Sequence, residues 1–384
     1  MFHIAREEDI KSGRVTDIYF ARTVEVLKAK GKNPWARAEI VLKGFPPGWQ
    51  WGILAGLEEG LRLLEGLPVN VEAMEEGTWF QTQQPVMVIE GHYLDFAVYE
   101  TALLGILCQA SGVATKTARC KRAAHGKSII SFGARRMHPA LAPMIDRSAF
   151  IGGCDAVSVI ISAELLGEPP TGTMPHALIL MMGDVASAAR AFHQVVDPQV
   201  KRVVLVDTFC DEKAEALRAA EALGKDLYGV RLDTPSSRRG DMYKILQEVR
   251  WELDYRGYGH VKLFVSGGLD EDEIGRLAEI ADSFGVGTSI SNAPVLDLGM
   301  DIVEVDGIPL SKRGKMSGKK QVWRCSSCRK TLVLAVGSDP ATCSCGGNFR
   351  ALLRPVLQQG KVIVDLPTPQ QIRSRVLAEL PHLP

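Results

Sequence analysis

The chain has 384 residues, too many for one ordinary hydrophobic core, and 46% of them are hydrophobic, which favours a folded protein of two or three domains. Lys and Arg together number 45, as do Asp and Glu, so the net charge gives no reason to expect nucleic acid or an acidic membrane as the main partner. The charged start MFHIAREEDIKSGR and the lack of about 18 uninterrupted apolar residues predict neither signal peptide nor membrane span. We expect a cytoplasmic enzyme.

The first hundred residues mix extended and helical patterns. Residues 38–42 and 86–90 are predicted strands, and residues 52–64 carry apolar side chains at helical spacing. This pattern predicts an α+β domain over residues 1–100.

From about residue 102 the pattern alternates between helix and strand. A long helix to 125 precedes strand 128–133, helix 143–151, strand 156–160 and four further strands at 203–206, 227–232, 261–265 and 284–287, the last four separated by helices 211–223, 240–255 and 270–281. Such alternation predicts parallel strands joined by right-handed crossovers. We assign residues 101–288 to an incomplete, irregular α/β barrel.

After residue 289 the strands shorten, and a hairpin is predicted at 302–305 with the turn Asp306-Gly307. We expect residues 289–322 and the tail 354–384 to complete the first domain. The basic loop SKRGKMSGKK then contributes Lys312, Arg313, Lys315, Lys319 and Lys320, which would suit pyrophosphate or ATP phosphates, although such a charge run is also common in solvated linkers.

Four of the eight cysteines crowd into a short segment that we assign to a separate module, residues 323–353. They are Cys325, Cys328, Cys343 and Cys345. Two tight turns that each supply two thiolates predict a tetrahedral zinc site, and because no position is left open the zinc would be structural. Disulfides would need an oxidising compartment. Cys108, Cys120, Cys154 and Cys210 are scattered and predicted to pack in cores.

The strand ends carry the polar chemistry of the predicted barrel. Because barrels build their active sites from the loops after the strands, these residues predict an enzyme. The four later strands run into Asp207-Thr208, Asp233-Thr234, Ser266-Gly267-Gly268 and, after Gly285 and Gly287, Thr288. The two aspartates would grip vicinal hydroxyls or share Mg²⁺, and the glycine loops would bind phosphate through backbone amides.

Two further loops carry candidate binding groups. Phe132 and the pair Arg135-Arg136 follow strand 128–133, where a ring and guanidinium groups would suit an aromatic acid. The loop 169–176 holds His176 in what we expect to be a rigid turn, and by itself that histidine is as often structural as catalytic.

These residues resemble the nicotinate phosphoribosyltransferase family, in its zinc-bearing archaeal and bacterial type, over nearly the whole chain. The matching segments are Thr16–Phe20, Tyr99–Thr101, Phe132–Arg136, Gly172–His176, Val206–Thr208, Arg231–Thr234, Ser266–Gly268 and Lys315–Arg324. The resemblance implies a type II phosphoribosyltransferase barrel. It also implies a reaction in which nicotinate and 5-phosphoribosyl 1-pyrophosphate give nicotinate mononucleotide and pyrophosphate, coupled to ATP hydrolysis and using Mg²⁺.

The resemblance also implies roles for single residues and a homo-oligomer, at least a dimer, with sites shared between subunits. Tyr19 would reach from a neighbouring subunit to stack on the pyridine ring opposite Phe132, with Arg135 near the carboxylate. His176 would be phosphorylated from ATP. Asp207 and Asp233 would hold ribose or metal. The resemblance also implies that the two glycine loops, with Ser266, Gly267 and Gly268 and with Gly285, Gly287 and Thr288, hold the 5-phosphate, and that Thr173 and Arg231 bind substrate.

Three alternatives stay open. Asp155 lies where related nicotinamide-using enzymes place a carboxylate that accepts from the amide, so nicotinamide phosphoribosyltransferase is one. The quinolinate-using relative shares the fold but needs additional cations for a second carboxylate, and the sequence offers no clear candidate. A zinc-ribbon tRNA-modifying barrel is the third, against which the neutral net charge and the few aromatics among basic residues argue.

Overall fold

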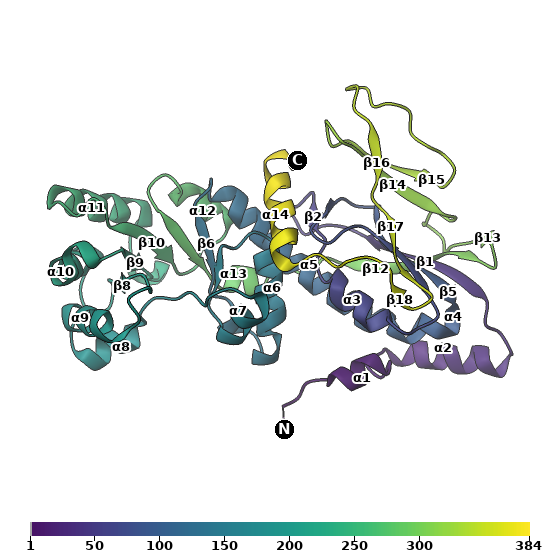
Figure 1. The fold of residues 1–384 in the computed structure, drawn as a ribbon, viewed down its shortest axis with the longest axis horizontal. Helices are drawn as coiled ribbons and strands as arrows, with labels where there is room; N and C mark the ends of the chain where they lie inside the picture. Colours follow the sequence, from purple (N-terminus) through teal and green to yellow (C-terminus); the bar gives the residue numbers. More distant parts are fainter. Residues whose placement is uncertain (1) are drawn as a thin grey trace. The chain divides into compact units, whose positions relative to one another are not determined.

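The computed structural model describes residues 2–384, which form two compact units (Figure 1). One unit combines the residues up to Thr115 with Pro294–Pro384, and the other consists of Lys116–Ala293. Helix α5 (Glu100–Ala123) begins in the first unit and ends in the second. The three-part division expected from the sequence, with a separate cysteine module, stays a prediction.

The first unit is built on a seven-stranded antiparallel sheet in the order β13-β12-β1-β5-β3-β17-β18. Its strands are β1 (Trp35–Leu42), β3 (Asn70–Ala73), β5 (Pro85–His92), β12 (Leu298–Val305), β13 (Ile308–Pro309), β17 (Arg354–Gln358) and β18 (Lys361–Val362). The strands predicted at 38–42 and 86–90 are confirmed as β1 and β5. The hairpin turn is confirmed too, since Asp306 and Gly307 both have positive φ, 48° and 78°, between β12 and β13.

Helix prediction was only partly correct over residues 52–64. Gly52–Ile53 form strand β2, which pairs with β4 (Trp79–Phe80), and helix α3 begins only at Leu57. Side-chain oxygens of α5 hold the intervening backbone, because Thr115 accepts from the Ile53 N–H and Ser111 from the Ala55 N–H. Those bonds, and the left-handed conformation of Gly56, keep the segment out of the helix.

The other elements of this unit include five further helices, two 3₁₀ turns and a second, three-stranded sheet. The helices are α1 (Glu7–Lys11), α2 (Ile18–Ala29), α3 (Leu57–Leu64), α4 (Tyr93–Phe96) and α14 (Pro369–Glu379), with 3₁₀ turns at Ala97–Tyr99 and Leu380–His382. A separate three-stranded sheet, β15-β14-β16, consists of β14 (Lys320–Cys325), β15 (Thr331–Ala335) and β16 (Phe349–Ala351).

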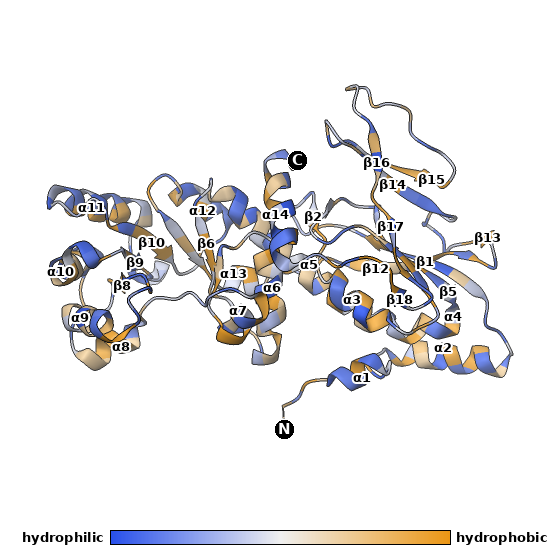
Figure 2. Ribbon diagram, in the orientation of Figure 1, coloured by the Kyte–Doolittle hydropathy of each residue, from blue (hydrophilic) through white to orange (hydrophobic). Residues whose placement is uncertain are grey.

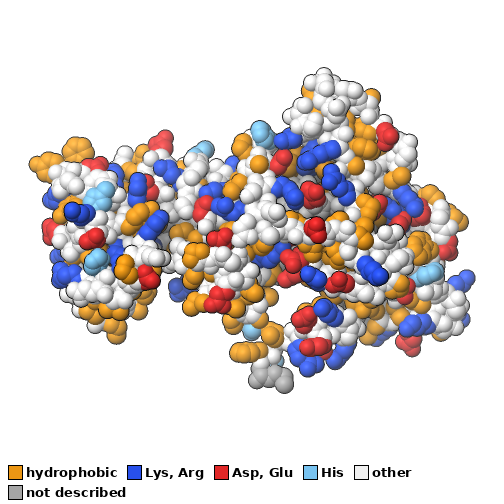
Figure 3. Space-filling view, viewed as in Figure 1, with side chains coloured by type: hydrophobic (Ala, Val, Ile, Leu, Met, Phe, Trp, Pro, Cys, Tyr) orange, Lys and Arg blue, Asp and Glu red, His pale blue; other side chains and the backbone are white. Residues whose placement is uncertain are grey.

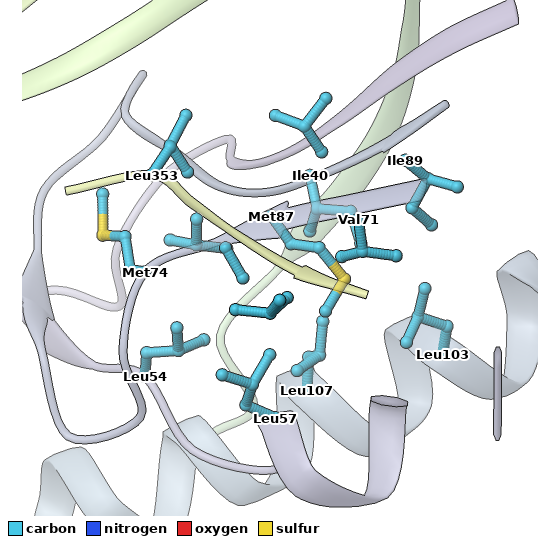
Figure 4. Close-up of a cluster of buried hydrophobic side chains, with 14 of the residues drawn as sticks. Ile40, Leu54, Leu57, Val71, Met74, Met87, Ile89, Leu103, Leu107 and Leu353 are labelled. Carbon is cyan, nitrogen blue, oxygen red and sulfur yellow. The ribbon is translucent and has the colours of Figure 1, made fainter. Parts of the chain in front are cut away.

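The core of the first unit lies between the seven-stranded sheet and helices α3 and α5. Figure 4 shows Ile40 and Met87 of the sheet facing Leu57, Leu103 and Leu107 of the helices. The run Tyr93–Ala123 is long and apolar enough to cross a membrane by length and composition alone, but it is the helix that supplies Leu103 and Leu107 to this core. We therefore interpret it as a core helix.

The second unit contains a six-stranded parallel sheet in the order β7-β6-β11-β10-β9-β8. The strands are β6 (Ser128–Ser131), β7 (Ala156–Val157), β8 (Val203–Leu205), β9 (Gly229–Leu232), β10 (Lys262–Ser266) and β11 (Ser283–Val286). The helices are α6 (Ala142–Ile151), α7 (Ile160–Leu166), α8 (His176–Met182), α9 (Val185–Val195), α10 (Glu212–Leu223), α11 (Met242–Tyr255), α12 (Glu271–Leu277) and α13 (Thr288–Ser291), with 3₁₀ turns at Ala134–Arg136, Pro139–Leu141, Gly224–Asp226 and Ser236–Arg238.

The sheet is an incomplete barrel, as predicted, because its edge strands β7 and β8 do not pair. Its strands are mostly hydrophobic, whereas helices such as α10 and α11 carry hydrophobic and hydrophilic residues together (Figure 2). Side chains from Asp211, Asp241 and Asp270 accept from backbone N–H groups in the first turns of α10, α11 and α12. These caps fix the first residue of each helix in the loop that follows a strand.

Between β7 and β8 the structure departs from the predicted alternation. The strand predicted at 156–160 ends at Val157, and Ile160 opens α7. The carbonyl of Val157 accepts from the Thr171 N–H, so a returning loop occupies the hydrogen-bonding position that a longer strand would use. Helices α8 and α9, which the sequence pattern did not predict, follow before β8.

Candidate active site

The carboxyl ends of β6, β7, β9, β10 and β11 surround a cavity of about 630 Å³, whereas the predicted catalytic residues Asp207 and His176 lie next to it without lining it. Parallel strands place all their carboxyl ends at one edge of the sheet, so loops that are far apart in the sequence meet there. Its lining includes these predicted site residues: Phe132, Arg135, Thr173, Arg231, Asp233, Ser266, Gly267, Gly268, Gly285, Gly287 and Thr288. The volume falls within the range of small-molecule sites.

Phe132 forms an aromatic wall of the cavity because β11 has glycine beneath it. A Cβ atom at Gly285 would lie 2.3 Å from Cε2 of Phe132, so any other residue would displace the ring. The guanidinium carbon of Arg231 lies 5.7 Å from the ring centroid, within cation–π range. Glycine at position 285 therefore has a packing role, in addition to the phosphate-binding role predicted from the sequence.

Asp207 and Asp233 are joined by hydrogen bonds across three strand ends. Oδ2 of Asp207 accepts from the backbone N–H of Asp233 at 3.2 Å and from the Thr234 hydroxyl at 2.9 Å. Oδ1 of Asp233 accepts from the Ser266 hydroxyl at 2.8 Å, and its Oδ2 lies 3.4 Å from Nη2 of Arg231. The ends of β8, β9 and β10 thus form one polar network.

One carboxylate oxygen in this network has no hydrogen-bond partner among the described residues. The side chain of Asp207 is only 4% exposed, and among the described residues its Oδ1 has no hydrogen-bond donor. Burial raises the pKa of Asp207, whereas the Thr234 hydroxyl acts in the opposite direction. Burial disfavours the charged form of Arg231 too, and for this basic group that lowers the pKa. A buried oxygen without a donor is a position for a cation or a ligand hydroxyl.

His176 does not lie in a rigid turn, as the sequence suggested, but is the first residue of α8, directly after Pro175. Its Nδ1 lies 3.0 Å from the Thr208 hydroxyl, and its Nε2 lies 3.8 Å from Oδ1 of Asp207 and 4.0 Å from Oδ2 of Asp233. The imidazole is 40% exposed. It is therefore oriented by a hydroxyl, faces two carboxylates and remains open to a second reactant.

The loop after β10 is shaped by two left-handed glycines. Gly267 and Gly268 have φ of 89° and 71°, and a Cβ at Gly267 would lie 3.0 Å from the Asp233 carbonyl oxygen. Space around Gly268 is open. This conformation brings the backbone close to the cavity without a side chain in between, which is what phosphate binding by amides requires.

Three residues that the sequence analysis left without a role support this site. Thr208 and Thr234 contact His176 and Asp207, and the repeated Asp-Thr pair after β8 and β9 was the signal for both. Glu215, in α10, is 1% exposed and accepts from the backbone N–H groups of Thr208, Phe209 and Cys210. Glu215 could not be identified from a local sequence pattern, because its role depends on hydrogen bonds to the turn after β8.

The loop after β6 brings two arginines to the cavity, whereas its histidine caps a turn. Arg135 and Arg136 are both exposed and both line the cavity. His138 instead accepts from the Ala140 N–H and caps a 3₁₀ turn. Arg136 is thus a second cation close to Arg135, and Arg231 is already paired with Asp233.

Asp155 lies away from the cavity. Its Oδ2 accepts from Nζ of Lys121 at 2.7 Å and from the backbone N–H of Ile129 at 2.8 Å. Ile129 lies near the amino end of β6, whereas the cavity lies at the carboxyl ends. The carboxylate that left nicotinamide open is therefore used to anchor a strand.

Tyr19 belongs to the other unit, where it lies on α2 with 56% of its surface exposed and its ring 4.3 Å from that of Phe20. The basic loop also belongs to that unit, and there the structure differs from the expectation of free phosphate-binding cations. Lys312 and Lys315 pair with Asp301, Lys319 with Glu90 and Glu304, and Lys320 with Glu39. The lysines neutralise carboxylates of the seven-stranded sheet.

The four clustered cysteines converge as predicted. Their Sγ atoms all lie within 4.8 Å of one another, with Cys325 to Cys345 and Cys328 to Cys343 at 3.5 Å, and none is in a disulfide. A zinc–sulfur distance of about 2.3 Å puts tetrahedral ligands about 3.8 Å apart. Backbone N–H groups, chiefly that of Cys328, lower the pKa of Cys325 to about 6, which favours the thiolate. The donor set fits a metal ion.

The scattered cysteines follow the prediction with one exception. Cys120 and Cys154 are buried and Cys108 is half-buried, but Cys210 is exposed at the loop after β8. Burial raises the pKa of Cys120 to about 12, which keeps it a thiol.

Comparison with known proteins identifies the family. Two models match, the quinolinate phosphoribosyl transferase N-terminal domain over residues 17–111 and its C-terminal domain over residues 113–301. The crystal structure of a nicotinate-nucleotide pyrophosphorylase from Pyrococcus furiosus is 52% identical, with a TM-score of 0.97 over 99% of this chain and 98% of that one. Human nicotinic acid phosphoribosyltransferase, 21% identical with a TM-score of 0.77 over 96% and 94%, shares the fold.

Curated relatives agree with these structures. Nicotinate phosphoribosyltransferase pncB2 of Mycobacterium tuberculosis is 30% identical over 80% of this chain and 74% of its own length. Nicotinate phosphoribosyltransferase pncB1 of the same organism is 28% identical over 96% of this chain and 91% of its own length. The chain therefore belongs to the nicotinate phosphoribosyltransferase family and has the fold of the quinolinate phosphoribosyl transferases.

Proposed function

We propose that this protein transfers the 5-phosphoribosyl group of its pyrophosphate donor to nicotinate, giving nicotinate mononucleotide and pyrophosphate for NAD biosynthesis, with ATP hydrolysis coupled to the step. The observation that carries the proposal is the meeting, around one cavity, of an aromatic ring, exposed guanidinium groups, Asp233 and a glycine loop, with Asp207 joined to Asp233 by a hydrogen bond behind the cavity wall. Each of these groups suits one part of the two substrates.

The substrates would lie along the strand ends in a defined order. Backbone amides of the loops at Ser266–Gly268 and Gly285–Thr288, to which Thr173 would be a neighbour, take the 5-phosphate. Asp233 and Asp207 take the ribose, and Phe132 stacks on the pyridine ring whose carboxylate pairs with Arg135. Tyr19 of the partner subunit would cover the other face of the ring.

The transfer requires that the pyridine nitrogen be held close to C1 of the ribose and that negative charge lie near C1. When pyrophosphate leaves C1 of the ribose, positive charge develops there, and the nearby carboxylates of Asp207 and Asp233 stabilise it. Holding the pyridine nitrogen in line with C1 converts an encounter of two reactants into a reaction within one complex. Mg²⁺ would be held by the unpartnered Oδ1 of Asp207 together with substrate oxygens, and would neutralise the leaving group.

His176 would accept the phosphoryl group from ATP. The imidazole is accessible, and the Thr208 hydroxyl fixes its orientation. A negatively charged phosphoryl group beside Asp207 and Asp233 changes the electrostatics of the ribose site. This proximity supports a direct coupling of ATP hydrolysis to the transfer.

Further parts of the proposal concern the metal, the assembly and the location. Zn²⁺ would occupy the four-cysteine cluster as a structural ion. The protein would be a homodimer or a higher homo-oligomer with shared sites, and would work in the cytoplasm. Quinolinate is the second candidate substrate, since Arg136 lies beside Arg135 at the cavity and supplies a cation for a second carboxylate.

The substrate assignment is tested by radiolabelled nicotinate, nicotinamide and quinolinate, each with and without ATP. We expect turnover of nicotinate, stimulated by ATP. Replacing Arg135 with Ala should raise KM for nicotinate about 10- to 100-fold, because a charge-assisted hydrogen bond is lost. Arg256→Ala, at the exposed C-terminal cap of α11, is the matched control and should leave KM unchanged. Preference for nicotinamide, or release of CO₂ from quinolinate, would refute the assignment.

The role of His176 is tested by His176→Ala. This variant should still form nucleotide slowly but should lose the stimulation by ATP and the ATP hydrolysis that accompanies transfer. His193→Ala, an exposed histidine on α9, serves as the control. Coupling that persists in His176→Ala, measured as ADP formed per nucleotide, would rule out His176 as the phosphorylated residue.

Sharing of sites between subunits is tested by mixing two inactive variants, Tyr19→Ala and Asp207→Ala. Hybrids then contain one site with both residues intact, so a freely re-assorting dimer should recover about a quarter of the original activity. The measurement is nucleotide formation before and after mixing. If no activity returns although subunits exchange, each site is self-contained.

The structural role of the metal is tested by Cys328→Ser. Losing one thiolate should release bound zinc and lower the free energy of unfolding by roughly 4 kcal/mol or more. The turnover of the remaining folded protein should stay within about twofold, because the cluster supplies no group to the cavity. Cys210→Ser is the control. A folded Cys328→Ser protein without turnover would instead make the metal catalytic.

A further inference from the structure

The first unit contains a second, smaller cavity that the proposed reaction does not use. It has a volume of about 160 Å³ and lies among α14, β4, β14 and β16. In Figure 3 blue side chains with red ones among them gather around a hollow in the region that Figure 1 labels between α14 and β16. Its charged lining consists of Arg324, Arg350, Arg354, Arg375, Glu75 and Glu379.

Both carboxylates of this cavity have an arginine at ion-pair distance, and one of their oxygens, Oε2 of Glu379, has no hydrogen-bond partner among the described residues. Glu75 lies 3.4 Å from Arg354 and 3.3 Å from Arg375, and Glu379 lies 3.3 Å from Arg329, which is outside the lining. Within the described part of the chain, no carboxylate lies at ion-pair distance from Arg324 or Arg350. The cavity thus has two more cations than anions on its walls.

The burial of Arg324 makes this excess of positive charge unfavourable in free energy. Its side chain is 1% exposed, and its guanidinium carbon lies 3.8 Å from the Trp79 ring centroid. Nη2 donates to the Trp79 carbonyl at 2.6 Å, and Nε to the Thr331 hydroxyl at 3.5 Å. Neutral acceptors do not balance a buried charge, which proteins normally pair with an opposite one.

A second buried donor lies at the same place. Trp79 is 3% exposed and lines the cavity, and within the described residues its indole Nε1–H has no acceptor. Buried N–H groups in native proteins almost always have an acceptor, so this one indicates a missing oxygen atom. The cavity therefore combines unpaired guanidinium charge with an unpaired hydrogen-bond donor.

We propose that this arginine-lined cavity binds inorganic phosphate. A tetrahedral dianion supplies the two negative charges that the walls lack, and arginine pairs bidentately with phosphate oxygens. The volume lies below the range of about 300–1,000 Å³ that drug-sized ligands need, which favours a small ion over a nucleotide. The site is distinct from the phosphate-binding loops of the barrel, which belong to the other unit.

Bound phosphate would link two segments that are far apart in the sequence. Arg324 and Arg350 come from β14 and β16 of the cysteine-bearing sheet, and Arg375 and Glu379 come from the C-terminal helix α14. The helix is also held by the buried side chains of Ile372 and Val376 and by the ion pairs of Arg375 with Glu75 and of Glu379 with Arg329. The anion would therefore slow local opening of α14.

The test uses the full-length zinc-loaded protein and hydrogen exchange of α14 with and without phosphate, at matched ionic strength. To remove binding at the barrel loops, the measurement is repeated in Gly268→Asp, because aspartate is one of the few residues that tolerate the left-handed backbone of this position and open space is left for its repelling carboxylate. We expect phosphate to slow exchange in α14 in both proteins. In Arg350→Gln, which changes an exposed side chain, the protein should stay folded and the apparent phosphate affinity should fall about tenfold.

Controls separate this site from general effects. Arg373→Gln, on the same helix but outside the cavity, should keep the affinity of the unaltered protein. The proposal is overturned if phosphate leaves α14 exchange unchanged, if Arg350→Gln responds as the unaltered protein does, or if chloride protects equally. Tighter binding of AMP than of phosphate would also overturn it, because the occupant would then be a nucleotide.

Discussion

The hydrogen bonds that tie Asp207 to Asp233, and Asp233 to Ser266, are the constraint on which the candidate site depends. Each carboxylate ends one strand and accepts from a group at the end of the next, so the ends of β8, β9 and β10 hold one another in place. The parallel sheet makes this possible because its carboxyl ends lie at one edge. His176 depends on the same network, through Thr208 and the two aspartates.

In the first unit, which contains the seven-stranded sheet, buried charged side chains follow two patterns. Along the seven-stranded sheet each buried carboxylate meets a cation, as Glu39 meets Lys320 and Asp301 meets Lys312 and Lys315. At the arginine-lined cavity, Arg324 is buried at least as deeply but meets only neutral acceptors. The contrast is informative because both places lie in the same compact unit and obey the same electrostatics.

Local patterns predicted the strands and the chemistry at their ends. The apolar runs that became β8 to β11 and the cysteine spacing that brought four Sγ atoms together were readable because each depends on neighbours in the sequence. Where the predictions were wrong, a distant partner was the cause. The helix expected from residue 52 begins at Leu57 because α5 holds the preceding backbone, and the strand expected to reach Ile160 stops where Thr171 returns.

The sequence by itself determined the class of protein, the alternating barrel pattern and the positions of Asp207, Asp233 and the glycine loops. Only the tertiary structure decided which groups are free to act. Asp155 and the basic loop have suggestive sequences, but Asp155 anchors a strand and the lysines pair with carboxylates. Glu215 gained importance from contacts with the turn after β8 that no local pattern records. Residue type and spacing depend on the chain alone, whereas the pairing of a charge depends on everything that folds around it.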